Sequence, residues 1–403
     1  MTASNPGDHE RVARTRAPRA VLLSFLALIS PSCVPHKLYN ELPEQYLQQV
    51  AWDEAGTVPA HLAVIEFDDH GMFWKRDQLE DTIDLIRDAN QAADDGTLVI
   101  IYIHGWKNNA NPESSEGSLV RFRESVRNVA AQSPADRSFA ADRVVGVFLG
   151  WRGRTSDIPL QEQFTFWDRR QAGERLASSH IQETLLRIMQ ITKDQPGSKC
   201  FIVGHSMGGL IVGKSVTSIL TTLLLSQGDE GTQLPVDLVL LQNPAIDALS
   251  SWQTIDLLKR VNARVELRMP NGNGLPARGP LIASITSEAD TATSRAYPFG
   301  RSIASFGTSF RRDHAPGEPS QRHLATHALG HVDSLTSHRA FLRDGEVVIE
   351  QIPGAFNDTP FWVIQVSKEI SKDHGDVGNP IYGRLVEQLI ELNDVYRTDL
   401  ETW

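Results

Sequence analysis

A serine between glycines is the part of the sequence best suited to chemistry. The stretch Gly204-His205-Ser206-Met207-Gly208-Gly209 follows an apolar run at 200–203 and precedes a helix-like run at 210–216. A strand, a Gly-x-Ser-x-Gly turn and a helix in this order form a nucleophile elbow, whose sharp turn strains the serine backbone. Glycine is expected at 204 and 208 because larger side chains would collide with the following helix. We therefore predict that Ser206 is a nucleophile beside a helix N-terminus, where N–H groups favour an oxyanion.

A serine hydroxyl needs a general base, and a histidine near the end of the chain is well placed to be one. In this arrangement the order along the chain is serine, acid, histidine. His374 follows the apolar run at 361–366, in a loop expected at the same sheet edge as Ser206. The competing histidines lie in a long segment before that run, and none of them follows a strand: His314, His323, His327, His331 and His338. We predict His374 as the base.

The acid should lie between these two residues, at the end of a strand. The apolar run at 281–286 ends in Ser287-Glu288-Ala289-Asp290, which makes Asp290 the leading candidate. Asp247, after the preceding strand, is the second candidate, and Glu288 is the third. In a triad the carboxylate fixes the tautomer of the imidazole and stabilises the imidazolium.

Two backbone N–H groups are expected to bind the oxyanion. One is that of Met207, directly after the serine, and the other comes from the loop that ends the strand at 97–103. That loop reads His104-Gly105-Trp106, and Trp106 is the candidate donor. A simple strand-ending turn is the alternative interpretation. The predicted chemistry is attack on an acyl carbonyl, followed by hydrolysis of the acyl-enzyme by water.

Strands and helices alternate along the chain that must position these residues. Apolar runs predict strands at 61–67, 97–103, 143–149, 200–203, 236–241, 280–286 and 361–366. Apolar spacing predicts helices at 76–93, 119–131, 162–190, 251–261 and 382–392, besides the one that follows the elbow. The pattern predicts an α/β fold with a mostly parallel sheet of about eight strands, covered by helices on both faces.

The chain divides into three parts. Residues 1–33 form an export signal, residues 34–58 a tether or short helical lead-in, and residues 59–403 the catalytic domain. Within that domain, 291–360 is rich in Gly, Ser, Arg and His and separates the last two predicted strands. A stretch of this length without structure is typical of a lid or binding insertion, or of disorder.

The motifs at 103–106, 204–209, 287–290 and 372–374 resemble those of the α/β-hydrolase superfamily, and within it bacterial lipase- and esterase-like proteins. The resemblance spans roughly residues 60–395, nearly all of the mature chain. It implies an eight-stranded core sheet, often with one antiparallel edge strand, and a serine hydrolase without a cofactor. It does not fix the substrate.

Composition narrows the class of protein. The chain has 403 residues and a formal charge of −11, without a basic stripe in the mature part. This length supports a core without disulfides or metals, and the charge argues against a nucleic-acid binder. Of the two cysteines, Cys200 falls in the strand before the elbow and reads as a small buried apolar residue. Cys33 lies outside the predicted fold, so no disulfide is expected.

The N-terminus reads as an export signal. Four arginines between positions 11 and 19 precede the apolar run at 21–29, which is too short to span a membrane comfortably but suits a signal peptide. Ser30-Pro31-Ser32-Cys33 resembles a bacterial lipoprotein cleavage site, although Ser30 replaces an aliphatic residue. We therefore predict an exported, envelope-located protein with an acylated Cys33 at the membrane surface. The alternatives are ordinary cleavage near Ser32, giving a periplasmic or secreted protein, or an uncleaved anchor.

Aromatic residues cluster in connections at the carboxyl ends of predicted strands: Trp106, Trp151, Phe164, Phe166 and Trp167. Ligand pockets are often lined in this way, so Trp151 and Trp167 are candidate substrate-binding residues, with ordinary core packing as the alternative. His323, His327 and His331 are spaced by four, as metal ligands can be. Gly330 weakens a helix there and no metalloprotease carboxylate accompanies them, so no metal or cofactor is predicted.

The function predicted from these residues is hydrolysis of small-molecule or lipid carboxylic esters by an esterase- or lipase-like enzyme. An acyltransferase with the same triad is the first alternative, since an alcohol would then replace water. The second alternative is a non-catalytic envelope protein with the same fold. Such a protein would not need a serine, an acid and a histidine together, which argues against this alternative. No sequence motif specifically indicates a peptidase.

Overall fold

The computed structural model describes residues 34–401, except 54–55, 116, 134–140, 157–158, 227–234, 265–278, 306, 312–318, 356 and 358. The strands in this part of the chain are β1 (Leu47–Ala51), β2 (Ala60–Glu66), β3 (Thr97–Ile103), β4 (Arg143–Gly150), β5 (Lys199–His205), β6 (Leu238–Gln242), β7 (Ile282–Ser287), β8 (His338–Arg343), β9 (Glu346–Gln351) and β10 (Phe361–Val366). They form one mixed sheet in the order β1-β2-β4-β3-β5-β6-β7-β10-β8-β9.

Most neighbours in this sheet are parallel. From β2 to β10 every pair is parallel, and β8 also runs parallel to β10. Antiparallel pairing occurs at the two edges, where β1 lies against β2 and β9 against β8. The protein is therefore α/β with a mostly parallel sheet, as predicted, and the strand count is ten in the described residues instead of about eight.

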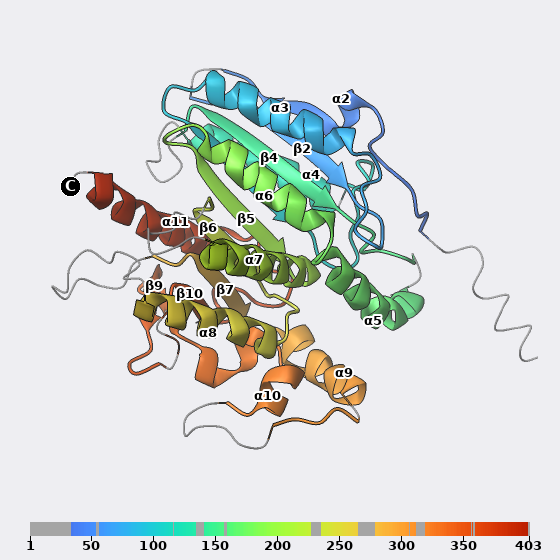
Figure 1. The fold of residues 1–403 in the computed structure, drawn as a ribbon, viewed down its shortest axis with the longest axis vertical. Coiled ribbons are helices and arrows are strands. Elements are labelled where there is room, and N and C mark those ends of the chain that lie inside the picture. Colours follow the sequence, from blue (N-terminus) through green and yellow to red (C-terminus); the bar gives the residue numbers. More distant parts are fainter. Residues whose placement is uncertain are drawn as a thin grey trace, which may run out of the picture.

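Helices lie on both faces of the sheet (Figure 1). They are α2 (Pro43–Tyr46), α3 (Asp77–Gln91), α4 (Ser118–Gln132), α5 (Pro159–Leu176), α6 (His180–Lys193), α7 (Met207–Ser226), α8 (Ala248–Arg264), α9 (Tyr297–Ala304), α10 (Gln321–Thr326) and α11 (Pro380–Glu401), with a π-helix at Ala292–Ala296 and 3₁₀ turns at Leu329–His331 and Asp333–Leu335. In the described residues no helix is long and apolar enough to cross a membrane.

Two apolar clusters lie on opposite faces of the sheet, because successive side chains of a strand point to opposite faces. In β2, Ala63 and Ile65 belong to the cluster that also includes apolar residues of α3, α6, α7 and α8. Leu62 and Val64 of the same strand point the other way, into the cluster formed with α4 and α11. Burial on both faces explains why the strands read as continuous apolar runs.

No strand was predicted in residues 34–58 or 291–360, but both segments contribute strands to the sheet. The predictions of a tether or helical lead-in and of an unstructured insertion are therefore wrong in part. Residues 34–58 hold the edge strand β1 besides the short helix α2. Residues 291–360 hold α9, α10 and the β8–β9 hairpin, which extends the sheet. Asp344 and Gly345 join β8 to β9 with φ of 53° and 85°. Asp-Gly at such angles is a typical two-residue hairpin turn.

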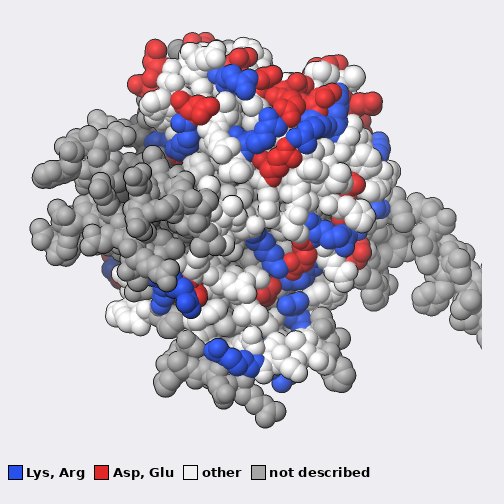
Figure 2. All heavy atoms as spheres, in the orientation of Figure 1, with Lys and Arg blue, Asp and Glu red and all other residues white. Residues whose placement is uncertain are grey.

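Charges of both signs are mixed on the face seen in Figure 2. Around α3 and α6 they pair across helices, where Arg76 contacts Glu183 and Arg187 contacts Glu80. A nucleic-acid-binding surface is marked by a broad basic patch or stripe. The described residues of this face form no such stripe, because Lys and Arg are mixed with Asp and Glu.

Candidate active site

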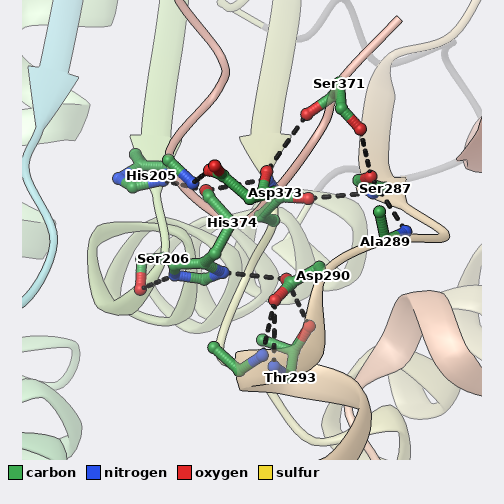
Figure 3. Close-up of polar contacts among 12 residues, drawn as sticks. His205, Ser206, Ser287, Ala289, Asp290, Thr293, Ser371, Asp373 and His374 are labelled. Carbon is green, nitrogen blue, oxygen red and sulfur yellow. Dashed lines mark hydrogen bonds and ion pairs between the residues drawn. The ribbon is translucent and has the colours of Figure 1, made fainter. Parts of the chain in front are cut away.

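Three side chains from distant parts of the sequence meet at the carboxyl ends of β5, β7 and β10. His374 Nε2 lies 2.8 Å from the Ser206 hydroxyl oxygen, and His374 Nδ1 lies 2.8 Å from Asp290 Oδ2. Figure 3 shows the imidazole between the hydroxyl and the carboxylate. A carboxylate only accepts, so Nδ1 carries the proton and Nε2 is free to accept from the serine. The three residues predicted as a triad are thus brought together.

The turn at Ser206 has the predicted strain. Ser206 follows β5 directly, has φ of 56° and is 7% exposed. A Cβ on Gly204 would lie 2.6 Å from the Gly208 carbonyl oxygen, inside α7. A Cβ on Gly208 would lie 2.0 Å from the carbonyl oxygen of Ile103, at the end of β3. The need for glycine at both positions is confirmed, although at Gly208 the obstacle is the neighbouring strand and not the helix.

Asp290 is fully buried and ionised at low cost. Its Oδ1 accepts the backbone N–H groups of Ala292 and Thr293, and its Oδ2 accepts the Thr293 hydroxyl besides His374 Nδ1. Burial alone would raise the pKa of the carboxyl, but the hydrogen bonds from His374 and Thr293 outweigh it and hold the pKa below its ordinary value. The carboxylate is therefore available to orient the imidazole.

The loop that carries His374 is held through its own backbone. The His374 carbonyl accepts hydrogen bonds from His205 Nε2 at 3.0 Å and from Asn243 Nδ2 at 2.9 Å. Burial, together with the neighbouring His374, lowers the pKa of His205 to about 4, so His205 is neutral at pH 7. Asn243 Oδ1 also accepts the backbone N–H of Ser287, which joins the ends of β6 and β7. Neither positioning role was predicted from the sequence.

The loop after β3 packs directly against the elbow. A Cβ on Gly105 would lie 2.9 Å from the Ser206 Cβ. Among the described residues, neither the backbone N–H of Trp106 nor that of Met207 donates to a protein acceptor. Met207 follows the serine and Trp106 follows Gly105, and both leave their backbone N–H groups unused, as an oxyanion site requires.

A buried histidine and the segment after β4 brace this loop. His104 Nδ1 donates to the Gly105 carbonyl at 2.9 Å, and His104 Nε2 accepts the Trp151 backbone N–H at 3.1 Å. The Trp151 indole donates back to the His104 carbonyl, and the two rings stack. Burial lowers the pKa of His104 to about 4, which keeps the neutral tautomer that both bonds need. Gly153 then accepts the Lys107 backbone N–H.

The two tryptophans predicted to bind substrate have different surroundings. Trp151 is 3% exposed and packs on His104, so its ring supports the loop and does not face solvent. Trp167 is half-buried and belongs to a row of aromatic rings that begins at Trp106, the residue after Gly105. The row runs Trp106–Phe166–Trp167–Tyr297, with ring centroids 5.2, 5.0 and 6.3 Å apart.

The other candidate acids lie away from the imidazole. Asp247 pairs with Arg170 at 3.3 Å and accepts from Ser250, while exposed Glu288 accepts the backbone N–H of Lys368. His338 lies in β8 and stacks on Trp362. His314 is outside the described residues.

One of the competing histidines does reach the triad, but indirectly. His331 Nε2 lies 2.8 Å from the Thr293 hydroxyl, which itself donates to Asp290. Since that hydroxyl gives its hydrogen to the carboxylate, it accepts from His331. His331 therefore helps to position Asp290 through Thr293, a contact that no sequence pattern indicated.

The described residues do not form the metal site that the spacing of three histidines could have given. α10 ends at Thr326, so His323, His327 and His331 do not share one helix. In the described ranges, no group of three or more His, Cys, Asp or Glu side chains could hold a metal ion. Cys200 is buried, as predicted, whereas Cys33 and the export signal lie outside the described residues.

Comparison with known proteins gives no further assignment. No protein-family model matches the chain, and no curated protein matches it.

Proposed function

We propose that this protein is a serine hydrolase that cleaves carboxylic esters through an acyl-enzyme. The observation that carries the proposal is the imidazole of His374, hydrogen-bonded at 2.8 Å to the Ser206 hydroxyl on one side and to the buried Asp290 carboxylate on the other. This arrangement is the one in which a base takes the serine proton while the carboxylate fixes its tautomer.

We also propose that the chain has the α/β-hydrolase fold. The eight neighbouring strands β1-β2-β4-β3-β5-β6-β7-β10 carry one antiparallel strand, β1, at the edge. This is the sheet that the resemblance implies, and β8 and β9 are additions beyond it. Support also comes from the position of the nucleophile, on a strained turn between strand and helix.

The proposed reaction uses the chain's own groups at each step. His374 Nε2 accepts the hydroxyl proton as Ser206 Oγ attacks the carbonyl carbon, and the same proton then passes to the leaving alcohol. The N–H groups of Trp106 and Met207 bind the oxyanion, aided by the N-terminus of α7. Water attacks the acyl-enzyme with His374 again as base, which returns Ser206 to its starting state.

The row Trp106–Phe166–Trp167–Tyr297 suggests the kind of acyl group. It extends from Trp106, whose backbone N–H is the proposed oxyanion donor, to Tyr297 in α9, and offers apolar ring surface over this length. An apolar acyl chain gains about 0.8 kcal/mol for each methylene that it buries on such a surface. We therefore propose esters with an apolar acyl group as the substrate class.

The proposal includes export and acylation of Cys33, on the sequence evidence alone. In that case the enzyme works at the cell envelope, and its first residue carries the lipid. A single acyl chain gives weak membrane attachment, whereas several chains on one cysteine anchor a protein firmly.

A covalent probe tests the proposed reaction most directly. A fluorophosphonate should label the folded protein at one residue, and peptide mass spectrometry should place the label on Ser206. The same preparation should hydrolyse p-nitrophenyl esters, with the rate depending on acyl length. An added alcohol acceptor would reveal acyl transfer as a second product. A folded protein that neither takes up the probe nor turns over any ester of the series would refute the proposal.

Gly153→Ala should lower kcat about 10- to 100-fold with a small change in KM. An added Cβ would lie 2.7 and 2.8 Å from the carbonyl oxygens of Gly105 and Asn108, so the loop that carries the Trp106 N–H must move. Full loss of one oxyanion donor costs about 10²–10³ in kcat, and displacement costs less. Steady-state kinetics on one p-nitrophenyl ester measures the effect. Gly383→Ala in α11, where a Cβ meets no atom within 4 Å, is the matched control. Equal kcat in the two variants would contradict the bracing role.

A further inference from the structure

The first described residues lie across the carboxyl edge of the sheet. Val34 donates its N–H to the Thr155 carbonyl at 3.1 Å, and its own carbonyl accepts Arg152 Nη2 at 3.0 Å. Both partners follow β4, and Val34 itself is buried. The chain is thus fixed to the body of the protein from its first described residue.

A buried carboxylate holds the continuation of this segment. Glu66, the last residue of β2, accepts the backbone N–H groups of Tyr39 and Asn40 and the side-chain amide of Asn40. The Asn40 amide also donates to the Ala110 carbonyl, in the loop after β3. Residues 34–40 therefore form a strap over the ends of three neighbouring strands, on the edge where Ser206 lies.

The strap determines where an acyl group on Cys33 would start. Cys33 is joined to Val34 by one peptide bond, so the two Cα atoms are about 3.8 Å apart. Since Val34 is held by two hydrogen bonds, no slack chain separates the acylated residue from the folded domain. A lipid attached there would keep the carboxyl edge of the sheet close to the membrane.

Large exposed apolar side chains are concentrated at the same edge. Leu42 follows the strap, Met72 and Trp74 lie in the loop after β2, and Phe299 lies in α9, after β7. Their exposed fractions are 50, 53, 36 and 72%. The Trp74 ring contacts the ring of His36 in the strap at 5.0 Å. In the sheet order β2 lies on one side of β5, beyond β3 and β4, and β7 lies on the other side, beyond β6. Met72, Trp74 and Phe299 therefore follow strands on either side of the one that Ser206 follows.

We infer that this edge faces the lipid bilayer and that the Ser206 site takes its ester substrates from the leaflet that holds the acyl chains. The inference rests on the proposed ester hydrolysis and on acylation of Cys33. Tryptophan and other large apolar side chains at the level of the headgroups add a second attachment to the acyl chains and determine which face of the protein meets the bilayer. A bilayer is the partner because the acyl chains would begin one residue from this edge.

Tryptophan fluorescence on vesicles tests the orientation without using activity. The acylated protein, purified from membranes, is reconstituted with vesicles whose lipids carry bromine on the acyl chains, which quenches nearby indoles. Among the described tryptophans at this edge Trp74 is the most exposed, and Trp106 and Trp167 are half-buried, so Trp74→Phe should lose a clear part of the quenching. The matched control is Trp52→Phe. Trp52 is 55% exposed but follows the amino-edge end of β1, about 20 Å away along the strands.

The possible results separate the orientation from the proposed function. Quenching that is unchanged in Trp74→Phe, or that disappears in Trp52→Phe, overturns the orientation, and so does an N-terminal peptide without acyl chains. Hydrolysis of soluble p-nitrophenyl acetate, measured on the same samples, reports the chemistry independently. The double variant Met72→Ser/Trp74→Ser should hydrolyse a vesicle-embedded ester about tenfold more slowly and the soluble ester at the rate of the wild type. Equal slowing on both esters would also overturn the orientation.

Discussion

Ser206→Ala protein should lose p-nitrophenyl ester hydrolysis, with kcat reduced about 10⁶-fold. The hydroxyl is the atom that attacks, and without it His374 has no proton to accept. The fold should persist, because the side chain removed makes only the bond to His374, while the Ser206 backbone still pairs with Gln242 and Leu210. Initial rates over a wide range of enzyme concentration, with circular dichroism and a thermal melt, measure both parts.

A serine of α7, the helix that follows Ser206, is the matched control. Ser218 lies on the exposed side of α7, where its hydroxyl donates to Gln182 Oε1 at 3.3 Å. Ser218→Ala should therefore hydrolyse the ester at the rate of the wild type. If Ser206→Ala hydrolyses the ester at a rate comparable to that of the wild type, Ser206 is not the nucleophile, whatever the control shows.

Asp290→Asn should lower kcat about 10⁴-fold while the protein stays folded. Oδ1 accepts two backbone N–H groups, from Ala292 and Thr293, so the amide oxygen must occupy that position. The amide nitrogen then takes the place of Oδ2 and donates to His374 Nδ1. The imidazole proton moves to Nε2, which points at Ser206 and can no longer accept its hydrogen.

The alternative acid provides the comparison for this variant. Glu288→Gln replaces an exposed carboxylate whose contact is the Lys368 backbone, so it should leave kcat within twofold of the wild type. Thr293→Val removes one hydrogen bond to Asp290 and the link to His331, and a smaller loss, of about tenfold, is expected. The kinetic constants of all three variants on one ester show whether the loss in kcat follows the expected order: Asp290→Asn largest, Thr293→Val smaller and Glu288→Gln smallest. An Asp290→Asn protein within tenfold of the wild type would show that another group orients His374.

The three residues of the proposed triad were predictable because local sequence determines each of them. Continuous apolar runs fixed the parallel strands, and the expected triad residues follow the ends of three of them. The supporting contacts were not predictable in this way. Asn243 reaches the carbonyl of His374 across 131 residues, and His331 reaches Thr293 across 38. Such pairs depend on how the ends of strands converge, which no local period or motif records.

The missed strands have a different cause. β8 (HRAFLR) and β9 (EVVIEQ) each hold three apolar residues between charged or polar ones, so they lack the longer apolar runs of the buried strands. The Asp344-Gly345 pair between them was a usable hairpin signal. β1 is short, contains two glutamines and is interrupted by an irregular register after Gln49. At both edges, partial exposure removed the pattern on which the prediction relied.

These same edge strands have a consequence for how the protein behaves in concentrated solution. An open edge offers unpaired backbone groups to which a second molecule can add its own strand. At one end β9 carries exposed Glu346 and Glu350, and at the other β1 is short and distorted near Gln49. A second copy that added its β9 to this β9 would bring negative charges together. At β1, few backbone N–H and C=O groups are aligned for a further strand to pair with. The sheet therefore ends in two borders that discourage growth into fibrils.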